Sequence, residues 1–352
     1  MYKFVFYRGL EYVFSFLYVI LGYQLLNVDE GLRFYDFVLI TTILTFSFSN
    51  ANNWLLKSED QSAYIQFQLM VSVILVGAMV GAGASEYIIY IPVVLLKSFS
   101  IVQLRIDRRE LLIPQYSLIF GLLNIIVIYF ISISAIPYRT TYFFITNGIT
   151  ACLLFKNLSL NINLSRLTFS RIADILNYLP IAAASFVSIN TDRFIVREIL
   201  DSADLIIYAQ YEVVSQGVVM ALLAVLFFYH KRILADQTTQ DIFKSFHKYL
   251  YPVTIITALF GVISSMFGSA YLGLDPNFML PLFIFKLTAL LVSYYTVYAQ
   301  TEDKESEFCS YVVLIYILIF VVCVCQFLPL ILGAFSSLML ILGNRIIAKR
   351  LQ

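Results

Sequence analysis

The sequence predicts an all-α polytopic membrane protein with about twelve transmembrane helices, and three observations predict this class. Of the 352 residues, 61% are hydrophobic and 13% are charged, whereas soluble domains average about 45–50% and about 25%. The apolar residues form stretches of about 20, the length that a helix needs to cross a membrane. Runs such as YVVLIYILIFVVCVC (311–325) show no polar–apolar alternation, so they predict helices rather than membrane strands.

The predicted spans follow one another with mostly short connections. In order they cover residues 4–26, 34–56, 63–83, 86–104, 112–134, 137–157, 173–195, 203–229, 249–272, 278–300, 308–328 and 330–348. The first is too long for a signal peptide and has no small-residue cleavage site, so we expect it to be retained as a span.

The placement of basic residues predicts that both termini lie in the cytoplasm. With the N-terminus inside, seventeen of the 23 Lys and Arg residues fall in inner segments and four fall in outer turns. This bias follows the positive-inside rule. The remaining two, Lys97 and Lys286, fall inside predicted spans.

Two similarities between the halves predict parallel repeats of six helices each. SEYIIYIPVVLLK (85–97) and LDPNFMLPLFIFK (274–286) share an acid, a Pro and a Lys at the same spacings. LLNVDEGLRFYDF (25–37) is similar to EILDSADLIIYAQYE (198–212). We therefore expect an N-terminal bundle over 1–157, a cytoplasmic linker over 158–172 and a C-terminal bundle over 173–352.

Lys97 and Lys286 are the best candidates for substrate-binding residues. A charge at mid-bilayer costs several kcal/mol, so it normally faces a helix-bundle interior or a wet cavity. One cation in each half could bind an anionic group, with Arg8 near the inner mouth. The alternative is that each Lys is paired with a carboxylate for packing alone.

Other charges near or within the spans are candidate gate or coupling residues. Glu212 lies well inside the eighth span and is the carboxylate that we single out for coupling; the alternative is a salt bridge to a neighbouring span. The further candidates are Asp192 and Arg193 at the end of the seventh span, Asp36 in the second and Glu11 in the first.

Motifs of catalysis and of metal binding are absent from the sequence. There is no P-loop, no G-x-S-x-G and no H-E-x-x-H. Cys152, Cys309, Cys323 and Cys325 have no His beside them, so we expect no metal site. A net charge of +1 gives no indication of nucleic-acid binding. The pattern favours a transporter over an enzyme, with no cofactor beyond a coupling proton or Na⁺.

The segment DRFIVREILDSADLIIYAQYEVV (192–214) resembles the turn between spans seven and eight of polysaccharide flippases in the MOP exporter superfamily. Asp192, Arg193, Phe194, Ile195 and Tyr208 carry the resemblance. The chain is shorter than most members, and Ile206 or Ile207 stands where a Gly often precedes the Tyr.

This resemblance implies a Wzx-type flippase with a MATE-like, V-shaped fold around a central cavity. Its substrate would be an undecaprenyl-diphosphate oligosaccharide, an O-antigen or capsule repeat unit, moved across the bacterial inner membrane. Lys97, Lys286 and Arg8 would bind the diphosphate, and the polymerase and chain-length proteins of the pathway would be partners.

Two other classes stay open. A drug or metabolite antiporter of the same fold would extrude small cations. An O-antigen polymerase or a membrane acyltransferase would be an enzyme of similar size. A polymerase would need a large outer loop, and the predicted outer turns are short. An acyltransferase would need a His in or near a span, and the two His, His230 and His247, fall together in one predicted cytoplasmic loop.

Overall fold

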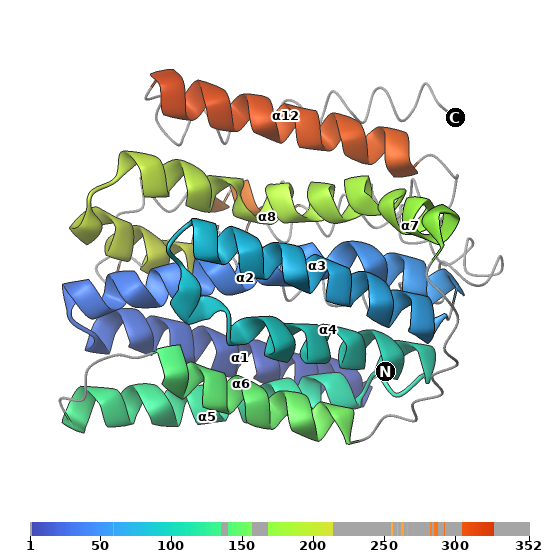
Figure 1. Ribbon diagram of the computed structural model, residues 1–352. Helices are drawn as coiled ribbons and strands as arrows, with labels where there is room; N and C mark the ends of the chain where they lie inside the picture. Colours follow the sequence, from blue (N-terminus) through green and yellow to red (C-terminus); the bar gives the residue numbers. More distant parts are fainter. Residues whose placement is uncertain are drawn as a thin grey trace. The chain divides into compact units, whose positions relative to one another are not determined.

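The structure is a computed structural model in which every described element is a helix (Figure 1). It describes residues 2–58, 60–134, 140–156, 168–213 and 305–326, with 255, 259, 262, 263, 266, 270, 282, 283, 285–287 and 292. The helices are α1 (Tyr2–Leu25), α2 (Val28–Ser58), α3 (Gln61–Gly81), η1 (Ser85–Tyr87), α4 (Tyr90–Ile106), α5 (Leu112–Ser134), α6 (Thr140–Phe155), α7 (Phe169–Leu176), α8 (Leu179–Ile199) and α12 (Glu305–Gln326). Residues 202–213 are also helical. The all-α prediction is confirmed for this part of the chain.

Four of the described helical segments are long and apolar enough to cross a membrane. They are Val28–Phe48, Gln61–Gly81, Ser85–Ile106 and Leu112–Ser134. Shorter apolar helices cover Gly9–Leu25, Thr141–Phe155 and Cys309–Val321. These segments indicate a membrane protein, while the full count of twelve spans stays a prediction.

Most observed helices overlap the predicted spans. α1 to α6 and α12 overlap the first six predicted spans and the eleventh. The predicted eighth span is helical from 202 to 213, beyond which it lies outside the described residues. Only scattered residues are described in the ninth and tenth spans, and none in the twelfth.

The predicted seventh span, 173–195, is wrong as a single helix. The structure has two helices there, α7 and α8, with a break at Asn177 and Tyr178. Pro180 is the second residue of α8. Proline has no amide hydrogen and fits only the first turn of a helix without loss, so a new helix begins beside it.

The chain divides into two compact units, Met1–Ala182 and Ala183–Gln352. The division falls in the first turn of α8. The predicted linker, 158–172, lies mostly outside the described residues, so the predicted domain boundaries stay a prediction.

In the first unit, α1 packs on α5, α2 on α4, and α6 on both α4 and α5. An aromatic cluster around Phe34 fills the space between α1, α2 and α6. The ring centroid of Phe34 lies 5.2 Å from that of Tyr23 and 5.6 Å from that of Phe143. Gly22 permits the close approach, because a Cβ there would lie 2.7 Å from the Phe34 ring.

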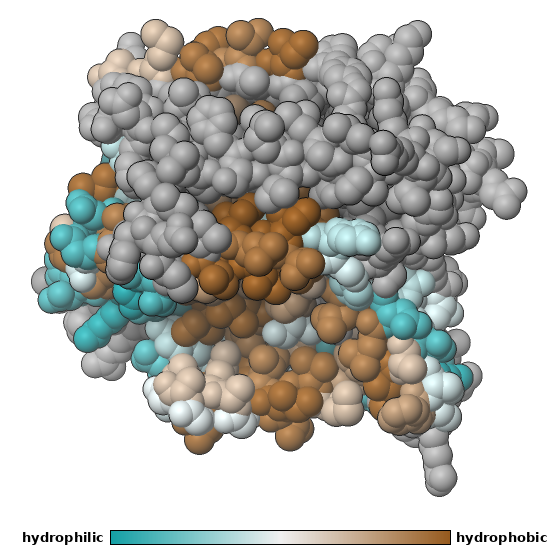
Figure 2. Space-filling model, turned by 90° about the horizontal axis from the view of Figure 1, so that it is seen from above, coloured by the Kyte–Doolittle hydropathy of each residue, from teal (hydrophilic) through white to brown (hydrophobic). Residues whose placement is uncertain are grey.

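Large apolar side chains on α3 and α5 point away from this core. They are Leu69, Met70, Val73, Ile74 and Val80 on α3, and Ile119, Leu122, Ile126, Tyr129, Phe130 and Ile133 on α5. Figure 2 shows apolar surface, in brown, over much of the described part of one face. A surface of this kind suits lipid rather than water.

A short corner with an Asx N-cap joins α1 to α2 in the first unit, and another joins α8 to residues 202–213 in the second. The Asn27 carboxamide oxygen accepts a hydrogen bond of 2.9 Å from the Glu30 amide at the start of α2. The Asp201 carboxylate accepts one of 2.9 Å from the Asp204 amide at the start of 202–213. Both are N-caps three residues ahead of their donors.

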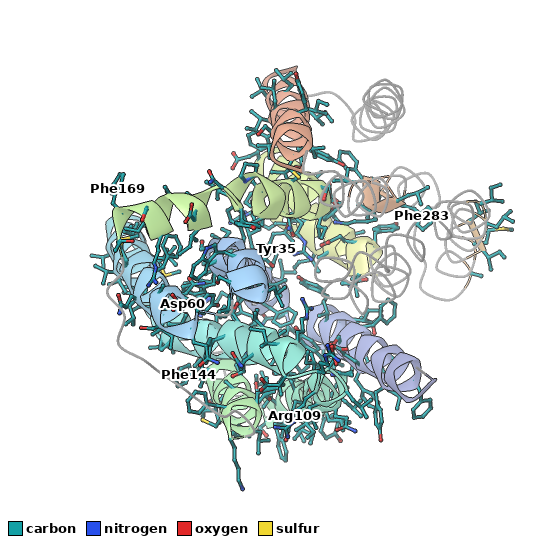
Figure 3. The ribbon with its side chains drawn as sticks, turned by 90° about the vertical axis from the view of Figure 1, so that its right-hand side faces the viewer. Tyr35, Asp60, Arg109, Phe144, Phe169 and Phe283 are labelled. Carbon is teal, nitrogen blue, oxygen red and sulfur yellow. The ribbon has the colours of Figure 1, made fainter. Side chains whose placement is uncertain are left out.

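α7 is a short helix anchored to the first unit. Thr168 caps its N-terminus, accepting a 3.4 Å hydrogen bond from the Arg171 amide. Ile175 is fully buried in a cluster with Trp54, Leu55 and Phe67 of α2 and α3. Figure 3 shows α7 running across the view toward Phe169 at the margin of the helices.

Candidate functional site: a buried ion cluster

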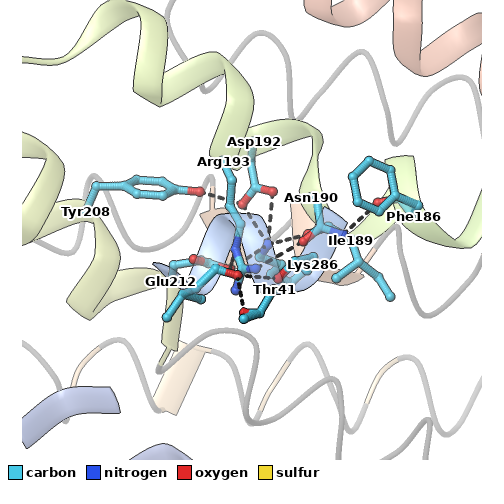
Figure 4. Close-up of polar contacts among 11 residues, drawn as sticks. Thr41, Phe186, Ile189, Asn190, Asp192, Arg193, Tyr208, Glu212 and Lys286 are labelled. Carbon is cyan, nitrogen blue, oxygen red and sulfur yellow. Dashed lines mark hydrogen bonds and ion pairs between the residues drawn. The ribbon is translucent and has the colours of Figure 1, made fainter. Parts of the chain in front are cut away.

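Four charged side chains meet inside the second unit and form what we call the ion cluster: Asp192, Arg193, Glu212 and Lys286. They come from three segments far apart in the sequence, namely α8, residues 202–213 and the helical residues around 286. Their exposed fractions are 1%, 8%, 3% and 1%. All four were predicted as site residues, and Figure 4 shows how they converge.

Lys286 is at the centre of the cluster. Its ammonium Nζ lies 2.9 Å and 2.8 Å from the two carboxylate oxygens of Asp192. It lies 3.1 Å from Glu212 Oε1 and donates a 2.6 Å hydrogen bond to the backbone carbonyl of Ile189. An ammonium has three hydrogens, and these partners use all of them.

Arg193 forms the second cationic part of the cluster. Its Nε donates a 2.7 Å hydrogen bond to Glu212 Oε1, and a terminal nitrogen donates one of 3.1 Å to Asn190 Oδ1. Glu212 Oε1 therefore bridges Arg193 and Lys286. Asn190 is fixed in turn, because its amide donates to the Phe186 carbonyl at 2.9 Å.

Tyr208 completes the surroundings of Asp192. Its hydroxyl donates a 2.5 Å hydrogen bond to Asp192 Oδ2. Tyr208 and Glu212 are four residues apart, which places both on one face of the helical segment 202–213. One face of this segment thus contacts both a carboxylate and the two cations.

Among the described residues the cluster is electrically balanced, with two carboxylates and two cations. A single buried charge without a partner is strongly unfavourable, whereas hydrogen-bonded pairs offset most of the desolvation cost. Lys286 is therefore paired with carboxylates in this structure. In this arrangement it can bind an added anion only if a carboxylate first withdraws or is neutralised.

Lys97 has different surroundings, although its sequence context matches that of Lys286. It is partly buried on α4, and its Nζ lies 4.4 Å from the centre of the Phe120 ring on α5, a cation–π contact. The charge of Glu11 on α1 is near enough to act on it. Among the described residues Lys97 has no ion-pair partner as close as those of Lys286.

The remaining predicted site residues lie in the first unit. Glu11 and Asp36 are partly buried on α1 and α2, and both have interaction partners. Arg8 is in α1, but its side chain lies outside the described part of the structure.

The sequence prediction did not assign a role in the site to Tyr208, Asn190 or the Ile189 carbonyl. In the sequence, Tyr208 is notable only as one of the residues that carry the resemblance to the flippase turn. Its separation of four from Glu212 was the available signal, because two polar residues at that spacing share a helix face. The carbonyl of Ile189 left no signal in the sequence, since every residue has one.

No protein-family model, curated protein or solved structure matches the chain. The fold and the site therefore define it as an all-helical protein with membrane-length apolar helices and a buried, charge-balanced ion cluster.

Proposed function

We propose that the chain is a lipid-linked oligosaccharide flippase of the bacterial inner membrane. It moves undecaprenyl-diphosphate-linked O-antigen or capsule repeat units from the cytoplasmic to the periplasmic leaflet by alternating access. In this proposal twelve helices form two parallel six-helix repeats with both termini in the cytoplasm. The polymerase and chain-length proteins of the same pathway are its partners.

The ion cluster is the observation that carries a transport function. Ionisable residues inside membrane helices are costly and normally mark a substrate or ion pathway. Here four ionisable residues from three segments occupy one buried site with a balanced charge, and the proposal places these three segments in membrane helices. A purely apolar contact would hold the same helices without the desolvation cost.

The two capped corners support the proposed repeat. Asn27 with Glu30 and Asp201 with Asp204 make the same capping contact at the same 2.9 Å. When the two units are aligned by matching Asn27 to Asp201, Tyr18 corresponds to Asp192 and Phe34 corresponds to Tyr208. The first unit has an aromatic pair there, with ring centroids 6.3 Å apart, and the second unit has the 2.5 Å hydrogen bond. These equivalent positions are therefore in contact in both units, through two aromatic rings in the first and through a hydrogen bond in the second.

Protonation gives the cluster a way to bind the diphosphate. A proton on Asp192 or Glu212 would leave one net positive charge, shared by Lys286 and Arg193. That charge would attract a diphosphate, and losing the proton would release it. A Na⁺ ion between the carboxylates would act in the same direction. Asp192 and Glu212 are the coupling residues in this scheme, with Lys286 and Arg193 as the cations that they control.

Lys97 would be the diphosphate-binding cation of the first unit, with Arg8 at the inner mouth. Its contact with the Phe120 ring is weaker than an ion pair and is worth about 0.5–2 kcal/mol. An anionic headgroup could therefore displace the ring without first breaking an ion pair.

The test is complementation of a flippase-null strain that makes the cognate repeat unit. The wild-type chain should restore surface polysaccharide. Lys97→Ala should abolish it at normal protein level, and Lys97→Arg should restore part of it. Arg33→Ala is the matched control, because Arg33 is an exposed cation outside the site. Normal polysaccharide in Lys97→Ala would remove the diphosphate role of Lys97, and failure of the wild-type chain with every repeat unit tried would overturn the flippase proposal.

A drug or metabolite antiporter of the same fold is the second candidate. One observation favours it: Lys286 is already neutralised, so the cluster has no positive charge to spare for an anion. Two buried carboxylates suit exchange of a cationic substrate for protons. Extrusion of small organic cations by vesicles containing the purified chain, together with failed complementation, would favour this function.

A further inference from the structure

The surface of α7 divides into three strips along the helix: one exposed and apolar, one exposed and polar, and one packed against the first unit. At about 100° per residue, Phe169, Ala173 and Leu176 share one strip of the helix, and all three are exposed. Ser170, Asp174 and Asn177 share a second exposed strip, which is polar. The third strip carries Ile172 and Ile175, which pack against α2 and α3.

An ion pair joins α7 to the start of α3. A terminal nitrogen of Arg171 lies 3.1 Å from Asp60 Oδ2, and Asp60 Oδ1 accepts a 3.1 Å hydrogen bond from the Ala63 amide as the N-cap of α3. α3 has 21 residues and spans about 30 Å, the thickness of a hydrocarbon core. With α3 crossing the membrane, Asp60 at its first turn would lie at headgroup level, and so would the helix bound to it.

Packing among the described residues does not account for the position of Phe169. Its exposed fraction is 87%, the highest among the exposed large apolar residues of the described chain. It lies at the outer margin of the helices (Figure 3). Lipid fits this position better than another protein does, because α3 of the same unit is long and apolar enough to cross a membrane and has exposed apolar side chains.

We propose that α7 is an interfacial helix whose Phe169–Ala173–Leu176 strip inserts into the headgroup and acyl boundary of the membrane. The Ser170–Asp174–Asn177 strip faces water, and the Ile172–Ile175 side is held on the bundle. A helix with this division lies in the plane of the interface. This inference requires only that the chain is a membrane protein, and it holds whatever the chain transports.

Tryptophan reporters in the full-length chain test the proposal. The only native Trp, Trp54, is buried and supplies a constant baseline. Phe169→Trp, Leu176→Trp and the matched control Asp174→Trp would be reconstituted in phosphatidylcholine–phosphatidylglycerol vesicles. Quenching would be measured with brominated acyl chains and with aqueous iodide, after each variant elutes as a single species in detergent.

The Trp residues at 169 and 176 should emit at a shorter wavelength than the Trp at 174. Brominated lipid should quench their fluorescence about three or more times as strongly as it quenches that of the Trp at 174. Iodide should show the reverse order. Equal iodide quenching at all three positions would overturn the proposal in favour of a solvated helix. Protection of 169 and 176 from both quenchers would overturn it in favour of a protein partner. Two reporters on one strip keep the test decisive if one variant fails to fold.

Discussion

Lys286 and Asp192 are 94 positions apart in the sequence, and both oxygens of the Asp192 carboxylate lie within 2.9 Å of the Lys286 ammonium. The pair ties α8 to a segment from the later part of the chain. Because Glu212 and Arg193 join it, changing any one member leaves the others with an unbalanced buried charge. The first two predictions follow from this relationship.

Charge balance should decide the stability of the second unit. Lys286→Gln should destabilise it by about 3–5 kcal/mol, because two carboxylates then face one cation. The double variant with Asp192→Asn should recover most of that loss, since Glu212 and Arg193 remain paired at 2.7 Å. Thermal unfolding of both variants in detergent measures the difference. A double variant no more stable than Lys286→Gln would contradict the role of charge balance.

Tyr208→Phe should remove one hydrogen bond to a charged acceptor. We expect a loss of about 1.5–3 kcal/mol in the free energy of unfolding, because Asp192 Oδ2 loses a donor at 2.5 Å. Ile207→Ala is the matched control on the same segment, where the side chain is exposed. Equal stability of the wild type and Tyr208→Phe in the same unfolding assay would show that this contact contributes nothing.

Gly22→Ala should destabilise the first unit. The added Cβ would meet the ring of Phe34 at 2.7 Å, and that ring is fixed by the surrounding aromatic cluster. Overpacking of this kind costs about 1–3 kcal/mol. Gly9→Ala in the same helix has open space around it and should gain up to about 1 kcal/mol through helix propensity. Thermal unfolding in detergent measures both variants. If Gly22→Ala and Gly9→Ala shift the unfolding temperature in the same direction, the close packing at Gly22 is contradicted.

The two capped corners should respond alike to loss of their caps. Asn27→Ala and Asp201→Ala should each cost about 1 kcal/mol, because each leaves helix N-terminal amides without an acceptor. Asn27→Asp and Asp201→Asn keep a capping oxygen and should retain most of the stability. Chemical unfolding in mild detergent measures the four variants. A large loss at one corner alone would argue that the corners are not equivalent.

The sequence was sufficient to predict the helices. Apolar stretches of membrane length leave a helix as the only way to satisfy backbone hydrogen bonds in lipid, so α1 to α6 and α12 were predictable. The break before α8 was missed because hydropathy continues through Tyr178 and Leu179, and only Pro180 hinted at it. The exposed apolar surface of α5 follows from the same hydropathy.

The sequence also identified all four charged members of the ion cluster, because a charge in an apolar span is conspicuous wherever it lies. It could not decide whether Lys97 and Lys286 were equivalent. Their local sequences match in acid, Pro and Lys spacing, yet one contacts an aromatic ring and the other two carboxylates. That difference depends on neighbours from other helices, which local sequence does not specify.

By itself the sequence indicated a membrane protein, the positions of most of the described helices and the residues too polar to face lipid, since each follows from composition and hydropathy along the chain. Only the tertiary structure decided which of these residues are partners. Lys286 reaches Asp192 and Glu212 because three distant segments pack together, and contacts of that kind depend on packing in three dimensions rather than on the order of residues.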